Sequence, residues 1–223
     1  MTRALGRLVR EIRRCRLCVE APLGKPLPHE PRPVLRVSTT ARLAIVGQAP
    51  GTRVHASGIP YSDPSGRRLR DWMGVSEDEF YDEARIAIIP MGFCFPGLDA
   101  AGGDLPPRRE CAPHWRPRLF ALLPQVELVL LVGLYAQRWH LGSDARRSMH
   151  ETVRDFRSLM ERPGLPRVIP LPHPSWRNNS WLNKNPWFEA VLLPELRRKV
   201  GGLIRDQSKN KPFTPVDHSS RTN

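Results

Sequence analysis

The sequence predicts an α/β protein, a three-layer α/β/α sandwich around a central, mostly parallel sheet of four strands. Four apolar runs of strand length are separated by segments in which apolar residues recur at helical spacing. Strands that alternate with helices form a parallel sheet covered on both faces. The 223 residues suffice for one sizeable core, so we expect residues 1–204 to form a single domain. Residues 205–223 are polar and lack periodicity, so we expect a disordered basic tail there.

The amino-terminal part of the chain is expected to lead into the first strand. Apolar residues at helical spacing predict a helix at residues 4–14. Five prolines predict an extended connection, not a regular element, at residues 19–40. The apolar run at residues 42–46 is of strand length and stops at a glycine, which predicts a buried strand.

The next segment is expected to hold two helices and the second strand. A glycine- and proline-rich loop precedes a helix at residues 65–73, and Ser76, followed by three acidic residues, predicts the N-cap of a second helix. The continuous apolar run at residues 86–89 predicts the second strand. Residues 91–107 are rich in glycine and proline and are expected to form a loop.

The carboxyl-terminal half repeats the alternation of helix and strand. We expect a helix from residue 111 to about residue 123, and a strand at residues 128–132 that ends at a glycine. Helical spacing predicts two more helices, at residues 135–141 and 146–160. The chain would then form the fourth strand and one last helix.

The fourth strand is expected at residues 168–171, where Pro172 stops it. The last helix should fill residues 186–204. Pro194 lies inside that range and removes one backbone hydrogen bond, so it should kink the helix or split it in two.

Charge and cysteine content limit the partners and the compartment. The formal net charge of +13 attracts polyanions, nucleic acid first and an anionic membrane surface second. There is no apolar run of about 18 residues, so we expect no membrane-spanning helix. Four cysteines without a signal peptide are few for a secreted disulfide scaffold. We expect a cytoplasmic monomer.

The cysteines are spaced like the ligands of one metal centre. Cys15 and Cys18 form a C-x2-C pair that can chelate one centre, and the distant Cys94 and Cys111 can complete a four-sulfur set once the fold closes. Four unrelated buried thiols are one alternative. Zinc is another, and spacing alone does not choose between zinc and iron–sulfur.

Two of the expected strands end in polar residues flanked by glycine or proline. The first is followed by Gly47-Gln-Ala-Pro-Gly51 and then by Tyr61 and Asp63, and the fourth by a Pro-His173-Pro-Ser175 segment. The carboxyl ends of parallel strands share one rim of the sheet, where open α/β folds bind ligands. We therefore expect one pocket that contains residues from both loops.

These motifs, in their order along the chain, resemble the uracil-DNA glycosylase superfamily and within it the iron–sulfur branches called families four and five. The likeness covers residues 15–178 and depends on six features: Cys15-x2-Cys18, Gly47–Gly51, Gly58-x-Pro-Tyr61, Cys94, Cys111 and His173-Pro-Ser175. The resemblance implies a monofunctional DNA repair glycosylase. Such an enzyme hydrolyses the N-glycosidic bond of uracil flipped out of DNA and leaves an abasic site in base excision repair. It also implies a structural 4Fe-4S cluster on the four cysteines.

The resemblance also implies roles for the pocket residues. Tyr61 would stack on the flipped uracil, and His173 would donate a hydrogen bond to uracil O2 and stabilise the charge on the departing base. Gly47, Ala49 and Phe93 would complete the base-binding site.

The first motif departs from the family pattern at a catalytic position. Family four has a Glu where this chain has Gln48, so Gln48 brings no carboxylate to the water. Asp63 is the nearest replacement and would orient water or offset positive charge on the sugar. Asp63 is equally suited to be the N-cap of the helix that follows it.

A second departure concerns recognition of the base. Family four usually has an Asn at the position of Pro90, where it reads the edge of uracil. We expect backbone groups around residues 91–93, or an Asn elsewhere, to take over this contact.

The segment after His173 is expected to contact DNA. It supplies Ser175, Arg177 and Asn178 for phosphate or for the opposing base, and Trp176 or Leu182 as the wedge in the duplex. Further phosphate contacts are possible from four arginines, Arg53, Arg67, Arg68 and Arg70. We expect Trp187 to belong to the core. The alternative to an enzyme is a non-catalytic iron–sulfur protein of the same fold that binds DNA or senses redox state.

Overall fold

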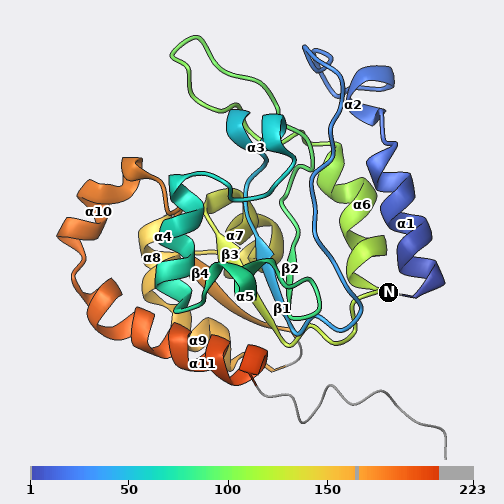
Figure 1. The fold of residues 1–223 in the computed structure, drawn as a ribbon. Helices are drawn as coiled ribbons and strands as arrows, with labels where there is room; N and C mark the ends of the chain where they lie inside the picture. The colour runs from blue at the N-terminus through green and yellow to red at the C-terminus, as the bar shows by residue number, and fades with distance from the viewer. Residues whose placement is uncertain (1, 164–165, 206–223) are drawn as a thin grey trace, which may run out of the picture.

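The computed structural model describes residues 2–163 and 166–205. Its centre is a sheet of four parallel strands in the order β2-β1-β3-β4, as Figure 1 shows. The strands are β1 (Leu43–Val46), β2 (Ile86–Ile88), β3 (Leu128–Val132) and β4 (Arg167–Leu171). The predicted α/β fold with its four-stranded sheet is confirmed, and every pair of neighbouring strands is parallel.

Both faces of the sheet are buried, because apolar residues fill successive strand positions that point to opposite sides. On β1, Ala44 and Val46 pack into one cluster and Leu43 and Ile45 into another. The first cluster is covered by helices α1 (Arg3–Arg13), α6 (Cys111–Phe120) and α7 (Leu134–Leu141). The three layers expected from the sequence are therefore present.

The second cluster is covered by helices from the middle and the end of the chain. Those that contribute buried side chains to it are α4 (Pro64–Met73), α5 (Glu77–Tyr81), α8 (Met149–Arg154), α9 (Phe156–Glu161) and α11 (Leu193–Arg205). The N-cap expected at Ser76 is present, since its side chain and that of Glu79 form a reciprocal capping box at the start of α5.

Several short helices lie where the sequence indicated only loop. They are α2 (Leu17–Glu20), α3 (Thr52–Ser57), α10 (Asn179–Lys184) and two 3-10 turns at Gly142–Asp144 and Trp176–Asn178. They are too short to show a helical apolar period, which is why periodicity missed them. Helix α3 ends at Gly58, whose φ of 73° is readily adopted only by glycine.

Two of the longer expected helices are broken, one unexpectedly and one as predicted. The segment at residues 146–160 divides at Asp155 into α8 and α9. The last helix is interrupted as predicted, because a π-helical turn at Phe188–Leu192 precedes Pro194 and α11. Helix α11 includes Arg205, which we had assigned to the tail, and the rest of the expected tail lies outside the described residues.

The carboxyl ends of the strands lie at the top of Figure 1, together with α3 and the loop that links β2 to α6. Within residues 2–163 and 166–205, no helix is long and apolar enough to cross a membrane. The rim of the sheet formed by these loops is the place where the two motif-bearing segments meet.

Candidate active site

A pocket opens at this rim and contains residues from both motif loops. Two prominent polar side chains in it are Asp63, from the first loop, and His173, from the second. Its lining is formed by Val34, Gly47, Gln48, Ala49, Pro50, Gly51, Val54, Pro60, Tyr61, Asp63, Ser65, Ile88, Pro90, Asp104 and His173. The fold therefore brings together Gln48, Tyr61, Asp63 and His173.

Tyr61 is held from both ends by glycines. Its φ is 56°, which is unusual for a residue with a side chain. The hydroxyl of Tyr61 lies so close to Gly47 that a Cβ at position 47 would overlap it. The backbone carbonyl of Tyr61 likewise lies close to Gly66, so a Cβ at position 66 would overlap that carbonyl. The ring packs edge-on against Phe80, with 5.9 Å between centroids. Burial, and then the charge of Asp63, raises the pKa of the Tyr61 hydroxyl, so it stays neutral.

Asp63 serves the fold and the pocket at once. Its Oδ1 accepts a hydrogen bond of 3.1 Å from the backbone of Gly66 and one of 2.5 Å from the hydroxyl of Ser65. It is therefore the N-cap of α4, as one of the two expectations had it. The carboxylate also lines the pocket, and its Oδ2 has no hydrogen-bond partner among the described residues.

Gln48 is tied to the loop between β2 and α6. The side-chain Nε2 of Gln48 donates to the backbone carbonyl of Leu105 over 3.4 Å. The backbone carbonyl of Gln48 accepts a hydrogen bond from the backbone N–H of Gly92. The hydrogen bond from Gln48 to Leu105 holds the neighbouring Asp104 in the lining of the pocket. Gly51 leaves room for this carboxylate, since a Cβ there would stand in tight contact, 3.3 Å from Oδ2 of Asp104.

His173 lies at the start of the loop that follows β4, two residues beyond its end at Leu171. Its backbone carbonyl accepts a 2.7 Å hydrogen bond from the side chain of Asn178, which fixes the loop. Burial lowers the pKa of the imidazole, against the charge of Asp63, which raises it, and with a further lowering by Arg177. The ring is therefore neutral near pH 7 and can donate one N–H group to a ligand in the pocket.

The side of the pocket at Pro90 contains no amide side chain. Arg116, buried with 2% of its surface exposed, donates to the carbonyls of Ile89 and Pro90 over 3.2 and 3.1 Å. The backbone N–H groups of the next three residues are also used: Met91 donates to Gly47, Gly92 to Gln48 and Phe93 to the sulfur of Cys111. These three N–H groups are not free to read a base, so a backbone contact from residues 91–93 would have to come from a carbonyl.

Phe93 lies outside the pocket, contrary to its predicted place in the base-binding site. Its ring is 2% exposed and lines a different cavity, beside Cys94 and Cys111. Beyond the end of β2 the chain turns so that the side chain at position 93 packs into the core layer of α1 and α6.

The residues expected to contact DNA divide into exposed side chains and side chains that serve the fold. Trp176 is the most exposed of the large apolar side chains, at 73%, and Arg177 is also exposed. Asn178 and Ser175 hold the loop, since Asn178 bonds to His173 and the carbonyl of Ser175 accepts from Arg68. Arg68 is thereby a tether between α4 and this loop rather than a free phosphate ligand.

Among the other residues considered for DNA contact, some serve the fold and two arginines are exposed. Leu182 and Trp187 pack against the second core cluster, which supports the expectation for Trp187 and leaves Trp176 as the exposed wedge candidate. Arg70 pairs with Glu77 at 3.0 Å and lies over the ring of Phe80. Arg53 and Arg67 are exposed near the mouth.

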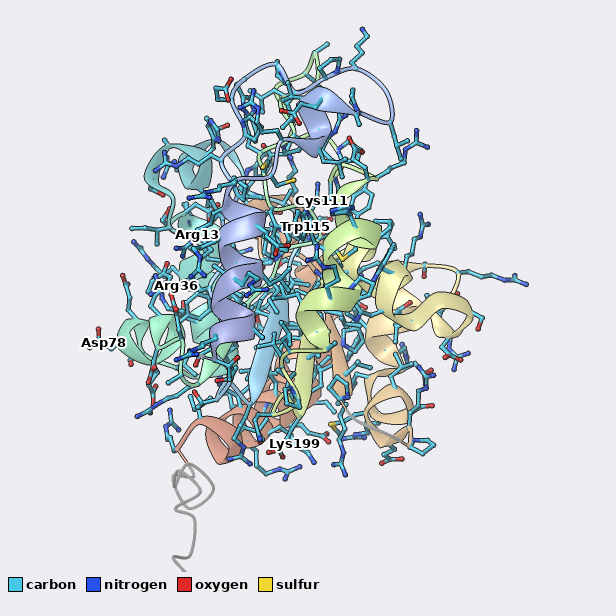
Figure 2. The ribbon with its side chains drawn as sticks, turned by 90° about the vertical axis from the view of Figure 1, so that its right-hand side faces the viewer. Arg13, Arg36, Asp78, Cys111, Trp115 and Lys199 are labelled. Atoms are coloured by element: carbon cyan, nitrogen blue, oxygen red, sulfur yellow. The ribbon has the colours of Figure 1, made fainter. Side chains whose placement is uncertain are left out.

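The four cysteines line a second cavity, together with Phe93 and Trp115. All four are free thiols. Figure 2 shows α1 and α6 side by side, with Cys111 and Trp115 of α6 between them. In the part of the chain that the structure describes, no three His, Cys, Asp or Glu side chains come together as a site for one metal ion. Burial raises the pKa of Cys94 and Cys111 to about 12, so both are protonated unless a cation compensates the thiolate charge.

Sequence reasoning missed two polar residues of the pocket, Ser65 and Asp104. Ser65 lies in the first motif region, and its hydroxyl is bound to Asp63. Asp104 comes from the middle of a glycine-rich loop, 41 residues beyond Asp63 along the chain, and only its carboxylate after Gly102-Gly103 marked it in the sequence.

Comparison with protein families gives a match that covers most of the fold. The model of the uracil DNA glycosylase superfamily matches residues 36–197. The matched range contains the four strands, the loop from Gly47 to Asp63, and His173, and it begins after Cys15 and Cys18.

Proposed function

This chain belongs to the uracil DNA glycosylase superfamily, whose members are hydrolases that act on DNA, and we propose that its substrate base is uracil. The protein would hydrolyse the N-glycosidic bond of a flipped uracil and leave an abasic site, without lyase activity. The observation that carries the proposal is the meeting of Tyr61, Asp63 and His173 in one pocket at the carboxyl ends of the strands.

His173 is suited to stabilise the departing base. When the bond between C1′ of the sugar and N1 of uracil breaks, the electron pair stays on N1 and its charge spreads to O2. A neutral imidazole that donates an N–H group to O2 stabilises this charge without having to lose a proton. Burial keeps His173 neutral and the contact to Asn178 fixes its loop, so the donor is preorganised.

Asp63 is suited to stabilise the sugar. Positive charge develops on the deoxyribose ring as the bond to uracil breaks. A carboxylate that lines the pocket and is fixed by two hydrogen bonds to Oδ1 offsets this charge without rearrangement. Asp63 would hold a defined position because its backbone begins helix α4.

Tyr61 is suited to grip the base. Gly47 and Gly66 leave it one place, and its ring faces the pocket with Phe80 behind it. A flipped pyrimidine can stack on such a ring. Gly47 and Ala49 line the same wall, where the lack of large side chains leaves room for the base.

The net charge and the mouth of the pocket support DNA as the partner. Exposed Trp176 and Arg177 lie on the segment after His173, where Trp176 would enter the duplex and Arg177 would contact phosphate. The four free thiols support a reducing compartment, so the cytoplasm stays part of the proposal, as does a monomer.

We also propose that the four cysteines hold a 4Fe-4S cluster. They line one cavity, yet they do not form a site for a single ion among the described residues. In a cluster each cysteine binds its own iron, so the sulfurs lie further apart than around one zinc ion. Bound there, the cluster would supply crosslinking and no chemistry of the reaction. It would join the segment that follows α1 to the loop that bears Asp104.

The cluster is tested by analysis of purified protein. We expect about four iron and four sulfide per chain and a brown colour that Cys94→Ser removes. One zinc per chain and no iron would instead support the zinc alternative.

The activity is tested with a duplex that contains a single uracil. Alkali should cleave the labelled strand after incubation with the wild type, because an abasic site has formed. His173→Ala should lower the rate by about 10²-fold to 10³-fold, whereas His114→Ala, an exposed histidine of α6, should leave it unchanged. A wild-type protein with its metal content intact that binds the duplex without releasing uracil would support the non-catalytic alternative.

A further inference from the structure

The pocket holds a second carboxylate that the roles above leave unused. Asp104 lies in the loop between β2 and α6, and this part of the loop has a defined structure. Leu105 donates to the carbonyl of Gly97, and Asp99 donates to that of Gly103. The Oδ1 atom of Asp99 in turn accepts hydrogen bonds from the backbone of Ala101 and Gly103, at 2.9 and 2.8 Å.

Residues 97–105 thus form a short hairpin, and two contacts attach this hairpin to the first motif loop, Gly47–Gly51. The amide of Gln48 donates to Leu105, next to Asp104. The carboxylate of Asp104 lies next to Gly51, where a Cβ would stand in tight contact with it, 3.3 Å from Oδ2. Gln48 and Gly51 thus place a carboxylate from the hairpin beside a motif loop that has no carboxylate of its own.

The two carboxylates of the pocket have different surroundings. Asp63 accepts two hydrogen bonds, from the hydroxyl of Ser65 and from the backbone N–H of Gly66. No described residue donates a hydrogen bond to the side chain of Asp104. Burial raises the pKa of Asp104, and the charges of Asp63 and Asp99 raise it further against the opposing effect of Arg177. Asp104 is therefore a better proton acceptor than an aspartate in water, which suits a base in the pocket.

We propose that Asp104 binds the attacking water and accepts its proton, while Asp63 stabilises the sugar. This inference rests on the proposed glycosylase activity and assigns its base. The water oxygen forms a bond to C1′ as the bond to N1 breaks, and the electron pair of that bond leaves with uracil. The water proton passes to Asp104 and then to solvent, and uracil N1 takes up a proton from solvent. The products are uracil and a sugar with a hydroxyl at C1′.

The test compares two Asp→Asn variants of the same hairpin. Asp104→Asn should lower the single-turnover rate of uracil release by about 10²-fold or more. Asp99→Asn removes the same charge, keeps an acceptor oxygen for Ala101 and Gly103, and lies outside the pocket, so it should stay within about threefold of the wild type. The inference would be overturned if Asp104→Asn kept the wild-type rate. It would also be overturned if both variants lost the same amount of rate, because the loss would then come from the removed charge alone.

A second variant separates a base from a merely structural residue. Asp104→Ala should be as slow as Asp104→Asn, and added formate, a small carboxylate, should restore part of its rate but not that of His173→Ala. A slow Asp104→Ala that formate leaves unchanged would argue against the role of base. Failure of the inference differs from failure of the proposed function, because in the first case the wild type releases uracil and in the second it does not.

Discussion

Gly47 lies against the hydroxyl of Tyr61, with no room for a Cβ between them. The backbone of Gly47 does not have a positive φ, so this glycine is required for space and not for a turn. Its carbonyl accepts a hydrogen bond from Met91, which fixes the loop to the end of β2. The first glycine of the motif therefore sets the position of the pocket's aromatic ring.

Gly47→Ala is expected to destabilise the protein by about 1–3 kcal/mol, because the new methyl group overlaps the Tyr61 hydroxyl. It should also slow uracil release by moving the ring. Tyr61→Phe removes the overlapping oxygen and leaves the nearest ring atom 3.4 Å from the Cβ. Urea denaturation of both single variants and the double variant should show that Gly47→Ala costs less in the Tyr61→Phe background. Equal costs in the two backgrounds would contradict the contact.

The two roles of Asp63 can be separated by the choice of substitution. Asn is as good an N-cap as Asp, so Asp63→Asn should keep the stability of α4 and lower only the rate of uracil release, by about tenfold or more. Asp63→Ala should lose about 1 kcal/mol of stability as well, since the Gly66 N–H loses its acceptor. Thermal unfolding and single-turnover rates measure the two effects. If Asp63→Asn released uracil at the wild-type rate, the only role of Asp63 would be to cap helix α4.

Two tryptophans near the pocket should respond in opposite ways. Trp176 is exposed, so Trp176→Ala should change the free energy of unfolding by less than about 0.5 kcal/mol. It should slow uracil release from duplex more than from single-stranded DNA, because only the duplex needs a wedge. Trp187 packs half-buried against the core and donates to Asn185 over 2.9 Å, so Trp187→Ala should cost about 2 kcal/mol. Comparable losses of stability in both variants would refute this division.

Buried histidines should make the protein less stable in acid. Burial, and then the charge of Arg116, lowers the pKa of His140 to about 3. Its Nε2 accepts a 2.6 Å hydrogen bond from Arg116, a guanidinium that can only donate, so the ring is neutral. Below the unfolded pKa of about 6.5 the unfolded chain binds a proton that the folded chain does not. Stability is therefore complete above that pH and falls as the pH drops toward the folded pKa.

His140→Gln keeps an acceptor for Arg116 and removes the titration. Urea denaturation between pH 7 and pH 4 should show a shallower loss for this variant, by about 1.4 kcal/mol per pH unit below pH 6.5. His173, whose pKa burial also lowers, still contributes to the remaining slope. An unchanged slope would mean that His140 is protonated in the folded protein.

The sequence by itself determined the sheet, because each strand is an apolar run bounded by residues that end it. The five apolar residues Leu128–Val132 are followed by Gly133, a pattern that predicts a short buried strand. The observed strand has the same bounds. Helix ends followed from local chemistry in the same way, as at Ser76 and Asp63, where a side chain caps the backbone three residues on. The place of the pocket followed as well, since parallel strands end at one rim.

Only the tertiary structure decided which side chains share that rim. Asp104 reaches the pocket because Gln48 holds a distant hairpin and Gly51 leaves space for it, and neither contact has a local signature. Phe93 turns into the core, although it follows the carboxyl end of β2 closely in sequence. Such contacts depend on where chain segments far apart in sequence pack against each other. Patterns of neighbouring residues specify elements, whereas the composition of a site is fixed when the elements meet.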